Sequence, residues 1–267
     1  MHIIFEHAEN NYYEPINAAY ACLPNAQCTF WVRKRKPTID MIDEMKPEMV
    51  FVYNESLDPS LVLAKQIHNF KLISLVRYNQ KNIDDYAHIV DLFITDNPNL
   101  NNEKVEYIKP FANVAQIAGA KYTPNYKSDI SIILTEPFNE TVKSYLDFIT
   151  TNFQVKIYGH KAPYPHYLGE IDLYERANII KSSKVLLGFT SNFEQDAKFL
   201  KVRNLVVDTQ GDSPLELIEK LQKLLQRQEV IQESVDTSFE VIENICDKLN
   251  MPNILEDIRA TKEEVLC

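Results

Sequence analysis

The stretch from Val155 to Asp208 reads VKIYGHKAPYPHYLGEIDLYERANIIKSSKVLLGFTSNFEQDAKFLKVRNLVVD. Three short apolar runs, VKIY, VLLGF and NLVV, alternate in it with two helix-period segments, 172–182 and 193–200. Helices of this length between strands act as crossover connections, which join parallel strands. Near-continuous apolar runs are typical of strands buried on both faces. This stretch therefore predicts a parallel sheet with helices on both of its faces.

The same rhythm continues on both sides of this stretch. Before it, Asp129–Leu134 predicts a strand, and Asn139–Phe153 predicts a helix whose apolar residues are spaced three and four apart. After it, Ser213 is the expected cap of a long helix with Pro214 in its first position. The remaining residues predict helices with a break at Pro252, and we expect the last helix to pack back on the N-terminal half.

A second strand–helix series occupies the N-terminal part of the chain. It includes the runs HIIFE at 2–6 and MVFVY at 49–53, and it ends before Asn113–Ser128, which lacks a clear period and is interpreted as a linker. The sequence thus predicts an α/β protein of two Rossmann-like domains, 1–120 and 121–267, the second carrying the C-terminal helices. We expect mainly parallel sheets that face each other across a cleft.

Composition narrows the class of protein. The net charge is −10, whereas a duplex-DNA binder normally presents a basic face, so duplex DNA is disfavoured as a partner. Glycine is scarce, with 5 residues, and the chain contains neither GxGxxG nor GxxxxGK[ST]. The 4 cysteines form no CxxC pair and have no histidine at zinc-ligand spacing, so no metal site is predicted.

The N-terminus lacks a signal-peptide pattern and no long apolar segment occurs, which predicts a cytoplasmic protein without membrane association.

Ligands of open parallel sheets bind beyond the carboxyl ends of the strands. In the N-terminal half, the first predicted strand is followed by a polar, aromatic turn in which His7 and Glu9 are candidate general bases; an ordinary polar loop is the alternative. The basic run Arg33–Lys36 follows the second strand and could attract an anionic acceptor, with a solvated loop as the alternative. Asn54–Ser56 follows the third strand and is a further candidate for lining the cleft.

Motifs in the C-terminal half point to a known family. They are a strand ending in Gly159-His160, the segment Gly169-Glu170-Ile171, the run Ser183–Leu187, the helix-opening pair Phe193-Glu194 and a strand ending in Val207-Asp208. Together they resemble the donor-binding half of GT-B glycosyltransferases, in particular the spore-maturation (CgeB-like) group and related phage enzymes. The resemblance covers about half of the chain, and it implies a GT-B-like fold.

The resemblance also implies a donor site. In the family, the helix-opening Glu binds the ribose hydroxyls, which assigns this role to Glu194. Thr190, Ser191 and Asn192 would donate hydrogen bonds to the diphosphate together with the helix N-terminus. Gly159 and His160 would line the same site.

The implied reaction moves a sugar from a nucleotide-sugar donor, a co-substrate rather than a bound cofactor, to an acceptor. The chain has no DxD motif, which argues against a metal-dependent GT-A enzyme. The first half normally supplies the base for the acceptor proton, which would be His7 or Glu9. The acceptor stays open between a glycan, a protein and a modified nucleobase. Two alternatives remain: a degenerate GT-B-like protein that binds a nucleotide-like ligand or a partner without turnover, and another two-domain α/β module.

Overall fold

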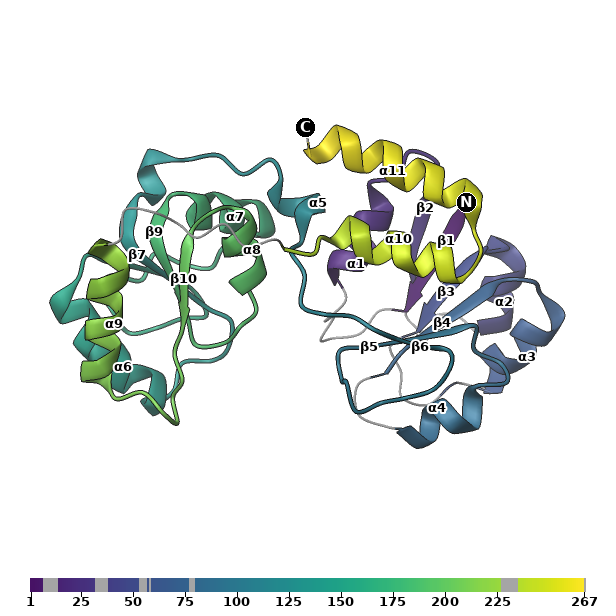
Figure 1. Ribbon diagram of the computed structural model, residues 1–267, viewed down its shortest axis with the longest axis horizontal. Helices are drawn as coiled ribbons and strands as arrows, with labels where there is room; N and C mark the ends of the chain where they lie inside the picture. The colour runs from purple at the N-terminus through teal and green to yellow at the C-terminus, as the bar shows by residue number, and fades with distance from the viewer. Residues whose placement is uncertain are drawn as a thin grey trace. The chain divides into compact units, whose positions relative to one another are not determined.

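The computed structural model describes residues 1–6, 14–31, 38–52, 57, 59–76, 80–226 and 235–266. By its internal contacts the chain divides into two compact units, drawn in Figure 1. Unit 1 comprises Met1–Pro110 and Asp236–Cys267, and unit 2 comprises Phe111–Val235. Each unit has its own sheet of parallel strands and its own hydrophobic core. The predicted α/β class with two parallel sheets is therefore confirmed.

Unit 1 is built on a six-stranded sheet in the order β2-β1-β3-β4-β5-β6, in which all neighbouring strands are parallel. The strands are β1 (His2–Glu6), β2 (Gln27–Trp31), β3 (Met49–Val52), β4 (Lys71–Leu75), β5 (Leu92–Thr95) and β6 (Val105–Tyr107). The helices are α1 (Glu14–Ala21), α2 (Thr38–Met45), α3 (Pro59–Ile67), α4 (Gln80–Tyr86), α10 (Ser238–Lys248) and α11 (Pro252–Leu266).

Both faces of this sheet are covered because successive side chains of a strand point to opposite sides. Val50 of β3 belongs to a core that α2 and α3 help to form. The next residue, Phe51, faces an aromatic cluster with Phe5 and Tyr20, at ring-centroid distances of 4.9 and 5.5 Å. Helix α10 packs on α1, as Figure 1 shows, and Cys246 Sγ lies 3.4 Å from the Tyr20 hydroxyl.

The unit boundaries differ from the domain boundaries that the sequence suggests. The C-terminal helices group with unit 1, where α10 buries Phe239, Ile242 and Ile245, and Asn25 donates to the Asp257 carboxylate of α11 at 3.1–3.2 Å. The segment 113–128, interpreted as a linker, belongs to unit 2. The expected packing of the last helix on the N-terminal half is thus met by α11, whereas the assignment of these helices to the second domain is not.

Unit 2 is built on a four-stranded parallel sheet in the order β10-β9-β7-β8. Its strands are β7 (Ser128–Leu134), β8 (Val155–Gly159), β9 (Ser183–Gly188) and β10 (Arg203–Val206). Its helices are α5 (Val114–Ile117), the 3-10 turn η1 (Pro124–Tyr126), α6 (Glu140–Asn152), α7 (Leu173–Lys181), α8 (Glu194–Phe199) and α9 (Pro214–Gln226).

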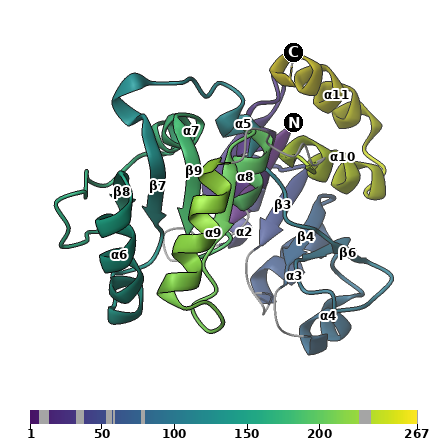
Figure 2. The ribbon, with the colours of Figure 1, turned by 60° about the vertical axis from the view of Figure 1, so that its left-hand side comes forward.

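The helices of unit 2 cover the two faces of its sheet. Helices α6 and α9 lie side by side over one face, as Figure 2 shows, and enclose a core that includes Ile132, Leu146 and Leu217. Right-handed crossovers that run in opposite directions along the sheet put their helices on opposite faces. Since the crossover to β8 runs one way and those to β9 and β10 run the other, α7 and α8 lie on the second face.

Candidate functional site

The strand order of unit 2 places a topological switch point between β7 and β9. The chain leaves β7 toward β8 on one side and returns to β9 and β10 on the other. Loops that leave the two strands at such a point diverge, and the crevice beyond their carboxyl ends is where open α/β sheets bind ligands. Two hydroxyl groups lie at this point. Thr135, which follows β7, has its Oγ1 3.1 Å from Oγ1 of Thr190, which follows β9. Thr190 is one of the residues that the sequence assigns to a donor diphosphate.

The loop after β9 folds back tightly on itself. A Cβ atom on Gly188 would meet the Thr190 carbonyl oxygen at 2.7 Å, so a glycine is needed at this position. The loop then exposes Ser191 and Asn192 to solvent and turns into α8, where the Glu194 N–H donates to the Ser191 carbonyl at 3.1 Å. The two predicted phosphate donors that follow Thr190 are therefore accessible.

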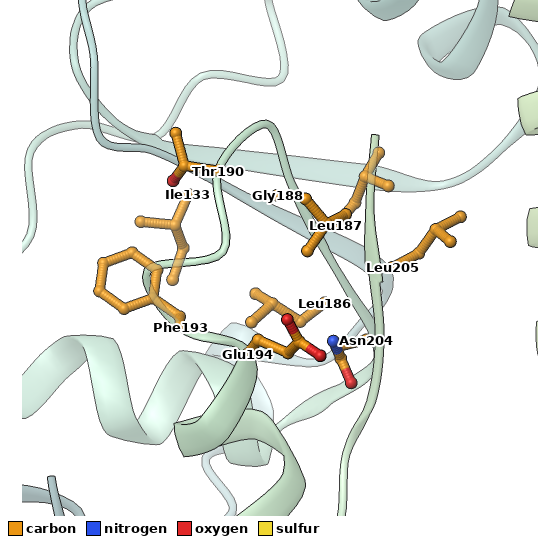
Figure 3. A pocket seen from close by; sticks show the side chains of 10 residues that line it. Ile133, Leu186, Leu187, Gly188, Thr190, Phe193, Glu194, Asn204 and Leu205 are labelled. Carbon is orange, nitrogen blue, oxygen red and sulfur yellow. The ribbon is translucent and has the colours of Figure 1, made fainter. Parts of the chain in front are cut away.

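Glu194 is the first residue of α8 and lines a hollow beside β10. Its carboxylate is 3.1 Å from Lys198 Nζ, one helical turn later, and its side chain is 31 % exposed. Figure 3 shows the Glu194 carboxylate close to the side-chain amide of Asn204, with Leu186 on the floor of the hollow. The hollow has a free volume of about 10 Å³, the room of about one water molecule. A nucleotide at Glu194 would therefore lie across the open edge of the sheet rather than inside this hollow.

The predicted residues at the carboxyl end of β8, Gly159 and His160, lie on the other side of β7. Gly159 has a φ of +88°, and a Cβ there would meet the Leu134 carbonyl oxygen at 2.3 Å. The His160 N–H donates to the same carbonyl at 3.0 Å, whereas the His160 side chain is exposed. The structure thus brings Thr190 and Glu194 to one hollow, while Gly159 and His160 occupy a separate position along the same carboxyl edge.

A buried polar cluster behind α8 escaped the sequence analysis. Asp196 is 5 % exposed, and its carboxylate accepts a hydrogen bond of 2.9 Å from the Asn113 N–H. Burial raises the pKa of the Asp196 carboxyl above its usual range, while the Asn113 N–H and the charge of Arg176 oppose this rise. The sequence does contain a sign that Asp196 is buried. Asp196 lies four residues before the apolar Leu200, so the two side chains lie on the same, buried face.

The same cluster contacts Phe193, the residue before Glu194. The guanidinium of Arg176, from α7, lies 4.8 Å over the ring of Phe193, and its Nη2 donates to Gln116 Oε1 at 3.3 Å. Gln116 belongs to α5 and also accepts a hydrogen bond from the Asn113 amide. The polar cluster, defined as Asn113, Gln116, Arg176 and Asp196, thereby connects α5, α7 and α8.

The remaining predicted sites of unit 1 lie outside the described residues. These are His7, Glu9, Arg33–Lys36 and Asn54–Ser56. Their roles stay predictions. No helix in the described ranges is long and apolar enough to span a bilayer. Across those ranges there is also no group of three or more His, Cys, Asp or Glu residues arranged to hold a metal ion.

A larger hollow of about 380 Å³ lies in unit 1 between the end of β6 and the start of α10. Four of the nine residues that line it are carboxylates, and three of these four have cationic partners. Glu106 pairs with Lys248, and both Glu240 and Glu243 pair with Lys262, at 3.3 and 3.8 Å. Most of the negative charge in this hollow is therefore neutralised within the protein, and the switch point of unit 2 is the stronger candidate.

Comparison with known proteins identifies the fold. No family model matches the chain, and no curated protein matches it. Solved structures do: the Staphylococcus aureus MnaA–UDP structure shares 13 % identity at a TM-score of 0.58, covering 94 % of this chain and 97 % of that one. The UDP-GlcNAc 2-epimerase of Methanocaldococcus jannaschii shares 13 % identity at a TM-score of 0.55, covering 92 % of this chain and 99 % of that one. The UDP-GlcNAc 2-epimerase of Rickettsia bellii shares 8 % identity at a TM-score of 0.56, covering 97 % of this chain and 96 % of that one. The chain thus has the GT-B type of fold, with two Rossmann-like units.

Proposed function

We propose that the protein binds a nucleotide sugar at the carboxyl edge of the unit 2 sheet. The observation that carries this proposal is the contact of Thr135 with Thr190 at the switch point, followed along the chain by Glu194 at the start of α8. Proteins of similar fold include one solved with UDP and several UDP-GlcNAc 2-epimerases, so UDP and its sugars are the first ligands to test.

The proposed roles follow from the chemistry of each side chain. The Glu194 carboxylate would accept hydrogen bonds from both ribose hydroxyls, and it is exposed enough to do so while Lys198 stays nearby. Thr190, Ser191 and Asn192 would donate to the diphosphate. Gly159 and His160, at the end of β8, would lie toward the sugar.

The proposed reaction is a glycosyl transfer of the kind that the CgeB-like resemblance suggests. The bond between the anomeric carbon and the diphosphate oxygen breaks, and a bond from that carbon to an acceptor oxygen or nitrogen forms. The nucleoside diphosphate leaves, and the acceptor proton goes to a general base, proposed as His7 or Glu9. No metal ion is part of the proposal.

Binding without turnover is the second candidate. Glu136 follows β7 and is exposed next to Thr135, at the edge where the diphosphate would lie. A carboxylate at this position repels phosphate oxygens unless a cation is bound between them. A protein that had lost transfer but kept nucleoside recognition would tolerate such a residue.

A ligand screen followed by product analysis tests the proposal. We expect UDP or a UDP-sugar to stabilise the fold, by about 2.7 kcal/mol at a hundredfold excess over the dissociation constant. Nuclear magnetic resonance of UDP-GlcNAc incubated with the protein then separates three outcomes: release of UDP with an acceptor, inversion at the sugar C2, and no change. Stabilisation without any product favours the second candidate. If no nucleoside diphosphate or nucleotide sugar stabilises the protein, the proposed function is wrong.

A further inference from the structure

The first turn of α8 depends on its neighbours for its position. Its N-cap residue, Phe193, makes no side-chain capping bond, as judged from residues that the structure describes on both sides of it. The helix has only 6 residues. Short, uncapped helices have little stability of their own. The orientation of Glu194 is therefore determined by the contacts that hold this turn from outside.

The polar cluster provides two of these contacts. Arg176 holds the ring of Phe193, the residue directly before Glu194, at 4.8 Å. The Asp196 carboxylate, two residues after Glu194, accepts the Asn113 N–H at 2.9 Å. Glu194 itself is turned toward the hollow beside β10, as Figure 3 shows. One helical turn thus carries a buried carboxylate on its inner side and the proposed ligand-binding carboxylate on its outer side.

The burial of Asp196 is costly for the fold. A carboxylate that leaves water needs strong partners, and here one backbone N–H and one neighbouring guanidinium oppose the loss of hydration. An apolar residue of similar volume would suit a site that is 5 % exposed. The presence of Asp196 is therefore better explained by the specific geometry that it imposes than by the stability that it adds.

We propose that Asp196 is a positioning residue that couples the Phe193–Glu194 turn to Asn113, in the segment that opens unit 2. The inference rests on the proposed function, because it requires a nucleotide at Glu194. A ligand that restrains Glu194 also restrains Asp196, and so strengthens the hydrogen bond to the Asn113 N–H. Because such coupling is reciprocal, weakening that bond lowers the affinity for the ligand.

The first test replaces Asp196→Asn and measures UDP affinity by titration calorimetry. Asparagine retains an oxygen that can accept the Asn113 N–H but removes the negative charge beside Arg176. We expect the dissociation constant for UDP to rise by roughly 2- to 30-fold, the usual range for indirect coupling. The matched control is Asp129→Asn, which removes a carboxylate paired with Lys184 at 2.7 Å, at the amino end of β7. The control should bind UDP as the wild type does.

The second test compares the wild type with Asp196→Asn. Amide hydrogen exchange of the segment 111–118 is measured in the full-length wild-type protein with and without saturating UDP. We expect the Asn113 amide to exchange more slowly with UDP, and we expect this protection to be smaller in Asp196→Asn, whose uncharged oxygen accepts the N–H more weakly. A residue that served stability alone would lower the melting temperature without changing this ligand-dependent protection.

The outcomes separate this inference from the proposed function. If UDP binds and Glu194→Ala weakens binding, but Asp196→Asn binds like the wild type or UDP leaves the Asn113 amide unchanged, the coupling is refuted and the nucleotide site stands. If the wild-type protein binds neither UDP nor another nucleoside diphosphate, the proposed function and this inference both fall.

Discussion

Replacing Glu194→Ala is the sharpest test of the candidate site. The substitution removes the carboxylate that lines the hollow beside β10 and ends its ion pair with Lys198. Two interpretations of Glu194 predict different results. A ribose-binding carboxylate affects mainly ligand affinity, whereas an acidic residue that only stabilises a helix start affects mainly the free energy of unfolding.

The affinity term follows from hydrogen bonds to a charged group, which contribute about 1.5–3 kcal/mol. If the ribose depends on Glu194, the dissociation constant for UDP should therefore rise by roughly 10- to 150-fold in Glu194→Ala. Titration calorimetry measures this change directly. Glu194→Gln, which keeps one acceptor oxygen without the charge, should give an intermediate value.

The stability term follows from the position of Glu194 in the helix. An acidic residue in the first turn contributes about 0.3–1 kcal/mol, and the partly exposed Glu194–Lys198 pair, four residues apart, adds about 0.3–0.5 kcal/mol. Glu216→Ala is the matched control, because Glu216 lies in the first turn of α9 and accepts the Ser213 N–H at 2.8 Å. The control should lose some stability and keep its UDP affinity.

Equal UDP affinities of the wild type and Glu194→Ala would remove Glu194 from the site. The same conclusion would follow if Glu216→Ala lowered the affinity as much as Glu194→Ala does, since the loss would then reflect a general weakening of unit 2.

Three further predictions concern stability. Gly159→Ala should lower the free energy of unfolding by about 1–3 kcal/mol in denaturant titrations, because φ is positive there and the added Cβ would clash with the Leu134 carbonyl. In the control Gly119→Ala, the added Cβ has open space around it, so the free energy of unfolding should change by no more than about 1 kcal/mol. The raised pKa of Asp196 means that the native state holds its proton to higher pH than the unfolded chain, so its contribution to stability falls as the pH rises through that interval. Asp196→Asn should therefore gain stability relative to the wild type as the pH rises above the usual carboxyl range, and a difference in stability that does not change with pH would contradict the shift. Phe239→Ala, at a fully buried position of α10, should lower the free energy of unfolding by about 3–5 kcal/mol in chemical unfolding. A loss below about 1 kcal/mol would show that α10 does not pack against the rest of unit 1.

Most elements of the fold could be predicted from local sequence patterns. The bounds of β1 coincide with the predicted segment 2–6, because an apolar run is a local signal. Strand β9 begins two residues earlier than its apolar run. Its first residue, Ser183, is buried and bonded to Ser131 at 2.7 Å, so hydrogen bonding across the sheet extends the strand beyond the apolar pattern.

The candidate site was harder to predict from the sequence than the fold was. The rule that ligands bind at carboxyl ends points to Thr190, but the order of the strands, which separates His160 from Thr190 by β7, depends on pairings between distant segments. The role of Asp196 was hidden for a similar reason. Its partner, Asn113, lies far away along the chain, in a segment interpreted as a linker.

The interrupted sequence of unit 1 has a consequence for the order in which the protein is made. A ribosome completes all of unit 2 before it adds the residues of α10, which pack on α1. Throughout that interval the nascent sheet of unit 1 lacks the helix that lies next to Tyr20, and apolar surface of this kind promotes association between chains. Unit 2, whose residues are contiguous, meets no such delay and can fold first. Translation that stops before α10 would therefore yield a chain with one finished unit and one that is prone to aggregate.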